Sequence, residues 1–475
     1  MITITRRQAR ELRSVFRRSV LGISHRGQIP PLVFQADGSK LRAQHRYGAL
    51  AVEHVLEDTS SAHETISLPL DLLPDVAGRE ETPIVLEAAA QDRTVVRWQD
   101  RGIPQVREYK VVEPAKSSSF PDSPATFATA PAGLLETLEE ASRTTAEDSN
   151  RYALSCLQMR GQAGQLAATD GRQLLIGSGF DFPWNDDVLV RRSPIFACRE
   201  LRTDSPVELG RTDAHVVIRV GSWTIFLEIQ KEARFPHVED VLPAANSART
   251  RLELAADDAQ FLSQAIDRLP GSHEHDAPVT FDLNGRVVLR ARSEEGRSTE
   301  LVLSRSSYSG DPVRLVTNRQ YLARAVRLGL RSLEITSPHE PVACRDEHRA
   351  YGWQPLNPES AIEPSEDAIC VDSASSKPTE SPKEKPIMNG SPAPSRRNVE
   401  HTAAANGTVA AAKDTTAPGL ASVIQEAEAL YQTLGQAKAQ TRTLVAALRR
   451  HRRQSKLVAN TLASLRQLQL QETAK

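Results

Sequence analysis

Arginines repeated along one face of a predicted helix are the residues best suited to chemistry near the start of the chain. Arg6, Arg10, Arg13 and Arg17 follow one another at intervals of three and four residues, which places them on one side of an α-helix. Guanidinium groups bind phosphate oxygens through paired N–H donors, so this face could contact a polyanion such as a nucleic acid. The same pattern is typical of a solvated helix face, and the residues alone leave both interpretations open.

A second basic cluster lies between residues 319 and 331. Arg324, Arg327 and Arg331 recur at helical spacing, with Arg319 nearby. Between the two clusters, the predicted helix GLLETLEEASRTTAEDS is acidic. A uniformly basic series of helices is therefore not expected, and any contact with phosphates must come from local arginine stripes.

Catalytic and metal-binding motifs are missing from the sequence. It contains no GxxxxGK[ST] phosphate loop, no HExxH and no GxSxG. The two histidines of SHEHD (residues 272–276) lie in a Gly/Pro-flanked turn, where a solvated loop is the usual explanation. The four cysteines are far apart and form no CxxC pair. We therefore expect no enzyme, no metal and no cofactor.

The length and composition predict several soluble domains. A chain of 475 residues is too long for one core and suggests three or four domains. No segment approaches the roughly 20 apolar residues of a membrane span, and the cysteine usage fits a reducing cytoplasm. We expect a cytoplasmic protein without membrane contact. The net charge of −1 does not predict polyanion binding through bulk charge.

Three segments share one order of predicted elements. An amphipathic helix opens each copy, at residues 6–20, 131–143 and 257–269. Two strands joined by a tight polar turn follow, in LVFQADGSKLRAQ, LQMRGQAGQLAATD and VTFDLNGRVVLRAR. A shorter helix or helical turn follows near Leu70, Ile195 and Tyr321. Matched landmarks in this order predict a triplicated α+β domain, with copies at residues 1–119, 124–244 and 249–357.

The composition changes after the third copy. Residues 358–418 are rich in Ser, Pro, Ala, Glu and Lys and predict a disordered linker. Apolar residues return at alternating spacings of four and three between residues 419 and 471, which predicts a coiled-coil-like amphipathic helix or a helical hairpin hinged at RRHRR.

Phrases within the three copies resemble the bacterial DNA polymerase III beta subunit, or sliding clamp, family. LAATDGRQLLI (166–176) is similar to its ATDG-x-RL segment, and ARFPHVEDVLP (233–243) to its FPDY-x-x-VLP segment. NRQYLARAV (318–326) is similar to its N-x-x-YL helix, and RAYGWQPL (349–356) lies where the family ends in YLVMPMRL. The resemblance covers residues 1–357 in order, and the chain then departs from the family by its C-terminal extension.

This resemblance implies three tandem DNA-clamp domains, with antiparallel sheets outside and helices lining a ring of two head-to-tail protomers. The implied function is to encircle double-stranded DNA without reading its sequence and to confer processivity on a replicative polymerase. DNA polymerase III and clamp-loader subunits are the implied partners, and the chain would be an accessory subunit without catalysis. The alternative is a clamp-like paralogue that acts as a regulatory scaffold or oligomerisation module.

The resemblance also implies a cleft between the second and third domains that binds partner peptides. Several positions differ from the family there, including Gln354 in place of a methionine, which suggests altered partner choice. Trp353 has a second interpretation, in which it only packs the last strand against its sheet. The residues matched to the cleft are Thr169, Gly171, Arg172, Leu174, Pro236, Val241, Trp353, Pro355 and Leu356.

Three further expectations follow from the resemblance. Tyr109 and Val111 would meet Ile266 and Leu269 of a second copy at the ring seam, and Arg26 would lie on a loop near DNA. The tail segment Gln467–Leu470 is similar to the clamp-binding pattern QL-x-LF without its final aromatic residue, so it could occupy the cleft of its own ring. The simpler interpretation is that these leucines complete an amphipathic helix.

Overall fold

The computed structural model describes residues 1–20, 29–57, 63–90, 92–112, 119–147, 153–272, 274, 276–293 and 296–375. The predicted linker beyond residue 375 and the helix at 419–471 fall outside these residues, as do Arg26, both histidines of SHEHD and Gln467–Leu470. Among the residues that are described, no helix is long and apolar enough to cross a membrane.

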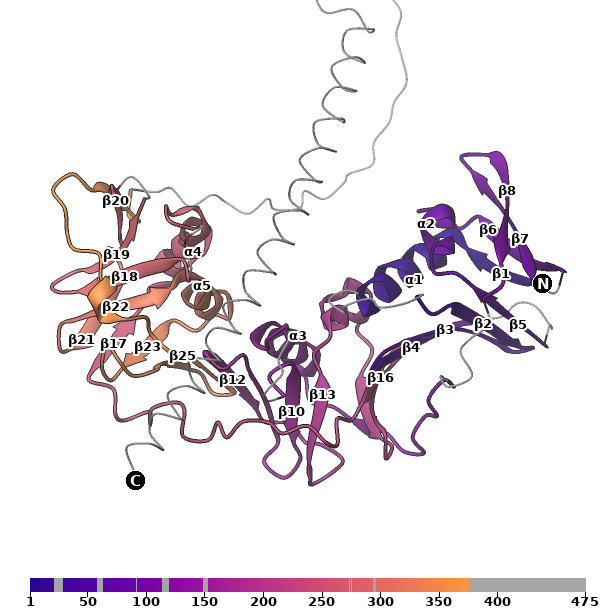
Figure 1. Ribbon diagram of the computed structural model, residues 1–475, viewed down its shortest axis with the longest axis horizontal. Helices are drawn as coiled ribbons and strands as arrows, with labels where there is room; N and C mark the ends of the chain where they lie inside the picture. The colour runs from indigo at the N-terminus through magenta and orange to yellow at the C-terminus, as the bar shows by residue number, and fades with distance from the viewer. Residues whose placement is uncertain are drawn as a thin grey trace, which may run out of the picture. The chain divides into compact units, whose positions relative to one another are not determined.

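In its described residues, the first copy contains two helices and two groups of four strands (Figure 1). Thr5 caps the first helix: its hydroxyl accepts from the Gln8 amide, and the Gln8 side chain accepts from the Thr5 amide. The elements are β1 (Ile2–Thr5), α1 (Arg6–Ser19), β2 (Leu32–Asp37), β3 (Lys40–Tyr47), β4 (Leu50–Glu57), β5 (His63–Leu68), α2 (Leu72–Val76), β6 (Pro83–Ala90), β7 (Arg93–Asp100) and β8 (Ile103–Lys110).

The second copy repeats this plan with a 3-10 turn in place of the short second helix. Ser193 caps that turn by accepting from the Ile195 amide. The elements are β9 (Ala128–Thr129), α3 (Leu134–Thr144), β10 (Cys156–Arg160), β11 (Gln165–Thr169), β12 (Gln173–Ser178), β13 (Asp187–Arg191), η1 (Pro194–Ala197), η2 (Arg199–Leu201), β14 (Val207–Arg211), β15 (His215–Val220) and β16 (Trp223–Glu228).

The third copy has the same plan with a longer second helix, which Asn318 caps. The elements are β17 (Thr250–Glu253), α4 (Ala256–Ala265), η3 (Ile266–Arg268), β18 (Pro278–Leu283), β19 (Val287–Arg292), β20 (Ser298–Val302), β21 (Ser307–Gly310), β22 (Val313–Asn318), α5 (Arg319–Arg327), β23 (Ser332–Ile335), β24 (Val342–Arg345), β25 (Arg349–Trp353), η4 (Pro358–Ser360) and β26 (Ile369–Asp372).

Backbone pairing joins each copy to the next. β4 pairs antiparallel with β16, with His54 opposite Trp223, and β12 pairs antiparallel with β25, with Leu174 opposite Gly352. These joints produce an eight-stranded and a nine-stranded sheet that each span two copies. The predicted strand–turn–strand units appear as β2–β3, β10–β11 and β18–β19, and each copy buries its helix stripe against them. The α+β architecture with three repeated copies is as the sequence predicts.

The first part of the predicted disordered linker is folded, which is a correction to the sequence-based prediction. Residues 358–375 are folded onto the third copy: Ile362 is buried and its amide donates to Thr280, and β26 pairs in parallel with β20. The composition of this segment is polar and proline-rich, but a few contacts to an existing sheet edge are enough to order it. The described fold of the third copy therefore includes residues 358–375.

Candidate functional site

A cleft of about 300 Å³ lies at the joint between β12 and β25. The turn before β12 builds one wall. Thr169 Oγ1 accepts from the Gly171 amide at 3.0 Å, and Gly171 has a φ of +91°, a left-handed conformation that favours glycine. The carboxylate of Asp170 accepts from the amides of Arg172 and Gln173 at 2.8 and 2.9 Å. This turn holds Leu174 at the base of the cleft.

The opposite wall comes from the segment after β16 and from β25. Gly352 permits the close approach of the two walls, because a Cβ there would lie 2.4 Å from Leu242 Cδ2 and 2.6 Å from the backbone oxygen of Val342. Val241, 44% exposed, presents an apolar side chain at the opening. Gln354 donates to the backbone oxygen of His339 and adds a polar edge. The site is an apolar groove with a polar margin.

Trp353 forms a buried part of this wall. Only 1% of it is exposed, and its indole N–H donates to Thr317 Oγ1 at 2.6 Å. Its ring packs beside Tyr351, whose hydroxyl donates to Gln173 Oε1 at 2.7 Å. Both sequence interpretations of Trp353 therefore describe part of its place: it lines the cleft and it anchors the last strand.

The cleft brings together seven of the nine expected residues: Thr169, Gly171, Arg172, Leu174, Pro236, Val241 and Trp353. Pro355 is buried and Leu356 donates its amide to Val316, and neither lines the cleft. Sequence reasoning missed Leu154, His237, Val238, Leu242 and Pro341. Val238 and Leu242 belong to the matched ARFPHVEDVLP segment and could have been found there. Leu154, which lies against the Gly171 turn, and Pro341, which precedes β24, fall outside the segments matched to the family.

Three of the arginines that could contact a nucleic acid instead bind acceptors within the chain, a correction to the exposure that such a contact requires. Arg6 is buried and pairs with Glu80 at 2.7 Å and Asp100 at 2.9 Å. Arg319 is 2% exposed and donates to the backbone oxygens of Ala277, Leu269 and Pro270. Arg324 pairs with Glu140 at 3.0 Å. The helical spacing is present as expected, but spacing alone does not show that neighbouring carboxylates and carbonyls bind these side chains.

The remaining expected arginines are more accessible. Arg10 and Arg17 are exposed and Arg13 is half-buried, and within the described residues none of the three is paired with a carboxylate. Arg331 is exposed, and the exposed Arg327 pairs with Asp267. The acidic helix α3 is largely neutralised, because Glu136 and Glu139 pair with Arg202. The accessible basic stripe therefore lies on α1.

The residues expected at a subunit seam mostly face inward. Ile266 is 0% exposed and belongs to the core of the third copy, a correction to its expected contact with a second chain. Leu269 is 5% exposed and packs on the same core, but it also lines a recess beside α4. Tyr109 is buried too, and its hydroxyl donates to Asp75 on α2 at 2.8 Å. Burial and this carboxylate raise the pKa of Tyr109. Val111 is half-buried, and its amide donates to the backbone oxygen of Asp92.

Solved structures share this architecture. The sliding clamp (DNA polymerase III subunit beta) of Pseudomonas aeruginosa bound to griselimycin matches with a TM-score of 0.61 and 18% identity. The C. crescentus beta sliding clamp matches with a TM-score of 0.61 and 19% identity, and the Thermotoga maritima DNA polymerase III beta subunit with 0.60 and 13%. Each match covers 75% of this chain and 99% of the other. The chain has the fold of a bacterial sliding clamp.

The clamp fold here carries a divergent sequence and an extension. No protein-family model matches the chain, and no curated protein matches it. The three copies are thus three DNA-clamp domains, and the cleft lies where the second clamp domain joins the third. Within the described residues no group of three or more His, Cys, Asp or Glu side chains could hold a metal ion.

Proposed function

We propose that this protein is a sliding clamp that encircles double-stranded DNA as a head-to-tail dimer. It would act in the cytoplasm as an accessory subunit that confers processivity on the replicative polymerase. The observation that carries the proposal is the clamp fold over nearly the whole length of the solved clamps. Three tandem domains supply half of a six-domain ring, and a heterologous contact closes when its rotation allows.

The α1 stripe supports a weak, mobile contact with DNA. Arg10, Arg13 and Arg17 could each approach a phosphate without a competing carboxylate from the described part of the chain. Phosphate contacts carry no sequence information, so a few exposed arginines allow sliding. With Arg6, Arg319 and Arg324 engaged internally, we propose that α1 supplies most of the DNA contact and that Arg327 and Arg331 add to it.

The cleft supports recruitment of partners by short peptides. An apolar groove with a few polar groups on its margin suits one or two apolar side chains of an extended segment. DNA polymerase III and clamp-loader subunits are the proposed partners. The polar Gln354 and the buried Trp353 leave less adaptable apolar surface than a methionine would, so we propose a narrower choice of peptides.

The decisive experiment compares retention on circular and linear DNA. The full chain is loaded with a clamp loader onto nicked circular DNA, washed in high salt, and then half of the sample is linearised. A closed ring stays on the circle and dissociates from the linear form. Equal retention on both, or dissociation from both with a monomeric mass in solution, would contradict the proposed ring.

The alternative, a clamp-like scaffold that does not close on DNA, has an observation in its favour. Three of the expected arginines are engaged in contacts within the chain, which lowers the positive charge available for DNA. A scaffold would still bind peptides in the cleft but would show no dependence of DNA retention on topology. The same experiment therefore separates the two functions.

A further inference from the structure

The internal repeat identifies two sheet edges that ought to correspond. Each domain has two groups of strands. At each joint, the edge strand of one group pairs with an edge strand of the next domain: β4 pairs with β16, and β12 pairs with β25. In the third domain the strand that corresponds to β4 and β12 is β20. In the first domain the strand that corresponds to β16 and β25 is β8. Within the part of the chain that the structure describes, these two strands have no such partner strand in another domain. β8 is at the end of its sheet, with β7 as its one strand neighbour among the described residues.

The edge of β20 is already covered by the chain itself. β26 pairs with it in parallel, from Thr299 opposite Ile369 to Val302 opposite Asp372. A strand that joined the third domain from another chain would therefore meet β26 before it met β20. Because β26 runs parallel to β20, its direction is that of β20. A β8 strand could therefore pair antiparallel with β26, just as the strands pair at the other two joints.

The strand β26 is held firmly by buried polar contacts. Ser373, 2% exposed, donates its hydroxyl to Asp258 Oδ1 at 2.7 Å, and its amide donates to the backbone oxygen of Val302 at 3.0 Å. Asp258 is itself 0% exposed and also accepts from Ser306 Oγ and the Arg305 amide. Removal of Ser373 would leave a buried carboxylate oxygen without this donor, which opposes release of the strand.

Apolar side chains remain exposed on β26 and on β8. Ile369 is 51% and Val371 36% exposed, while Ile103 and Val106 on β8 are 63% and 64% exposed. Natural edge strands are usually protected by charges, prolines or bulges, and β26 (Ile-Cys-Val-Asp) has little such protection. β26 is therefore an edge suited to being covered by another strand, while β8 has Pro104 and three charged residues and offers Ile103 and Val106 as its exposed apolar side chains.

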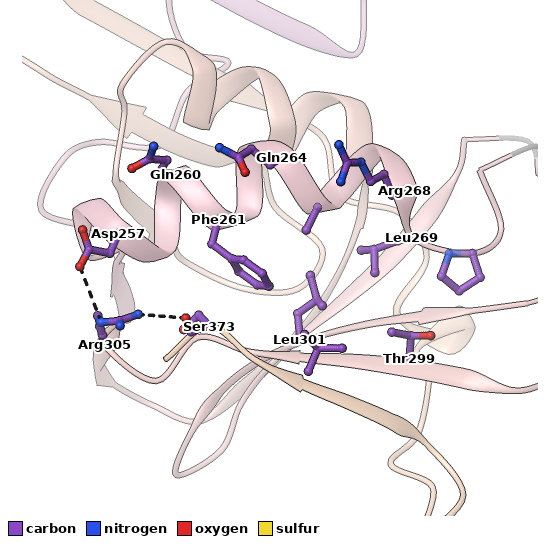
Figure 2. A pocket seen from close by; sticks show the side chains of 13 residues that line it. Asp257, Gln260, Phe261, Gln264, Arg268, Leu269, Thr299, Leu301, Arg305 and Ser373 are labelled. Atoms are coloured by element: carbon purple, nitrogen blue, oxygen red, sulfur yellow. Dashed lines mark hydrogen bonds and ion pairs between the residues drawn. The ribbon is translucent and has the colours of Figure 1, made fainter. Parts of the chain in front are cut away.

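A recess of about 400 Å³ lies beside β26 (Figure 2). Phe261 of α4 and Leu301 of β20 point into it, and Val371 also lines it. Alternation along a strand places Ile369 on the same face as Val371. On β8, the inward-facing Tyr109 places Ile103 on the helix side of its sheet. An incoming β8 would therefore direct Ile103 toward this recess.

We propose that β26, from the extension after the third domain, is the seam strand of the ring, and that its occupant is β8 of a second copy. The inference rests on the ring assembly proposed above and changes where that ring closes. Each seam then contains one strand more than the joints within the chain, so the two domains are about 4.8 Å further apart than direct pairing of β20 with β8 would place them.

Cysteine cross-linking tests this seam directly. Cys370 on β26 is exposed, whereas Cys156, Cys198 and Cys344 are buried. Position 370 alternates with Val371 and so faces away from the helices, as do positions 104, 106 and 108 of β8. We expect at least one of Pro104→Cys, Val106→Cys and Glu108→Cys to form a covalent dimer with Cys370 under mild oxidation of the full chain.

Two controls accompany the cross-links. Arg97→Cys lies opposite Val106 on the neighbouring strand β7, on the same face but one strand farther from the seam, so it should not cross-link. A Cys370→Ser background should remove every covalent dimer. If the chain is a dimer in solution and none of the three positions cross-links, the ring stands and this seam is overturned. A monomer at all concentrations overturns the ring itself.

Charge variants test whether β26 takes part in the contact between two chains or only covers the edge of β20. Ile369→Lys should weaken the dimer by about tenfold or more in Kd, while Ile29→Lys, a matched change at an exposed isoleucine outside the seam, should leave it unchanged. A chain ending at Leu356 should dimerise less than the full chain. A tighter dimer after either change to β26 would show that this strand blocks closure, and would overturn the proposal.

Discussion

Arg324 of α5 reaches across the boundary between the second and third domains and donates from Nη2 to the Glu140 carboxylate of α3 at 3.0 Å. Its guanidinium also lies over the Tyr351 ring, 5.8 Å from the centroid. Burial lowers the pKa of Arg324, and the nearby Glu140 opposes that shift. The acidic helix α3, whose charge is unexpected in the proposed DNA-binding ring, thus has a structural partner in the basic helix α5 of the next domain.

Arg324→Ala should reduce stability by about 1–3 kcal/mol, because it leaves a partly buried Glu140 with one partner fewer. The measurement is the free energy of unfolding in urea. Arg331→Ala is the control, since Arg331 is exposed and should change stability by less than about 0.5 kcal/mol. Equal effects of the two changes would contradict a structural role for Arg324.

Replacing Arg10, Arg13 and Arg17 together by Ala should weaken DNA binding evenly across sequences. The slope of log K against log salt should fall by up to about 0.9 for each phosphate that the variant no longer neutralises. The control removes three exposed arginines away from the helices: Arg97 of β7, Arg251 of β17 and Arg286 in the turn between β18 and β19. If the slope changes no more than in this control, the arginines of α1 do not contact DNA and form a solvated helix face.

Val241→Asp should weaken binding of a QL-x-LF peptide by about tenfold or more, because a carboxylate at the opening of the apolar cleft would have to lose water. Fluorescence anisotropy of a labelled peptide measures the effect. Ile29→Asp makes a matched change outside the cleft. Unchanged affinity in Val241→Asp would exclude this groove as the peptide site.

Ile266→Lys should unfold the third domain rather than only separate subunits. The side chain is fully buried, and an unpaired ammonium there should cost more than about 4 kcal/mol. Thermal unfolding measures the destabilisation. Gln264→Lys, on the exposed face of α4, should leave the melting temperature nearly unchanged. A folded but monomeric Ile266→Lys variant would restore the original seam assignment.

Stability should decline as pH falls below about 6.5. Burial lowers the pKa of His54, which stacks on Trp223 with 3.9 Å between ring centroids, to about 4. Between these pH values the unfolded chain binds the proton and the folded chain does not, so acid favours unfolding, by up to about 3 kcal/mol at pH 4.

The check on this pH dependence is a pair of unfolding series between pH 7 and pH 5, before most carboxylates titrate. His54→Phe keeps an aromatic ring against Trp223 and cannot be protonated, so its stability should vary less with pH than that of the unchanged chain. His45, whose pKa burial also lowers, should account for part of the remaining slope. Identical slopes would contradict the assignment to His54.

The triplicated α+β plan could be predicted from the sequence because its signals are local. Helical spacing of Ala9, Leu12 and Phe16, and alternation around the polar turns of each copy, depend only on which face of an element is buried. The cleft residues were expected by another route, the resemblance of short segments to the sliding clamp family, and seven of the nine lie together in the structure.

Only the tertiary structure decided which of the polar residues expected at the surface bind acceptors within the chain. Arg6 has the helical spacing of the surface arginines on α1, and Arg319 lies next to a similar cluster. Acceptors 70 or more residues away bind Arg6, and acceptors 42 to 50 residues away bind Arg319. The polar composition of residues 358–375 predicted a linker, but Ser373 finds a buried acceptor in Asp258 and β26 an open edge in β20. Such contacts depend on pairing between distant segments, which composition and periodicity do not encode.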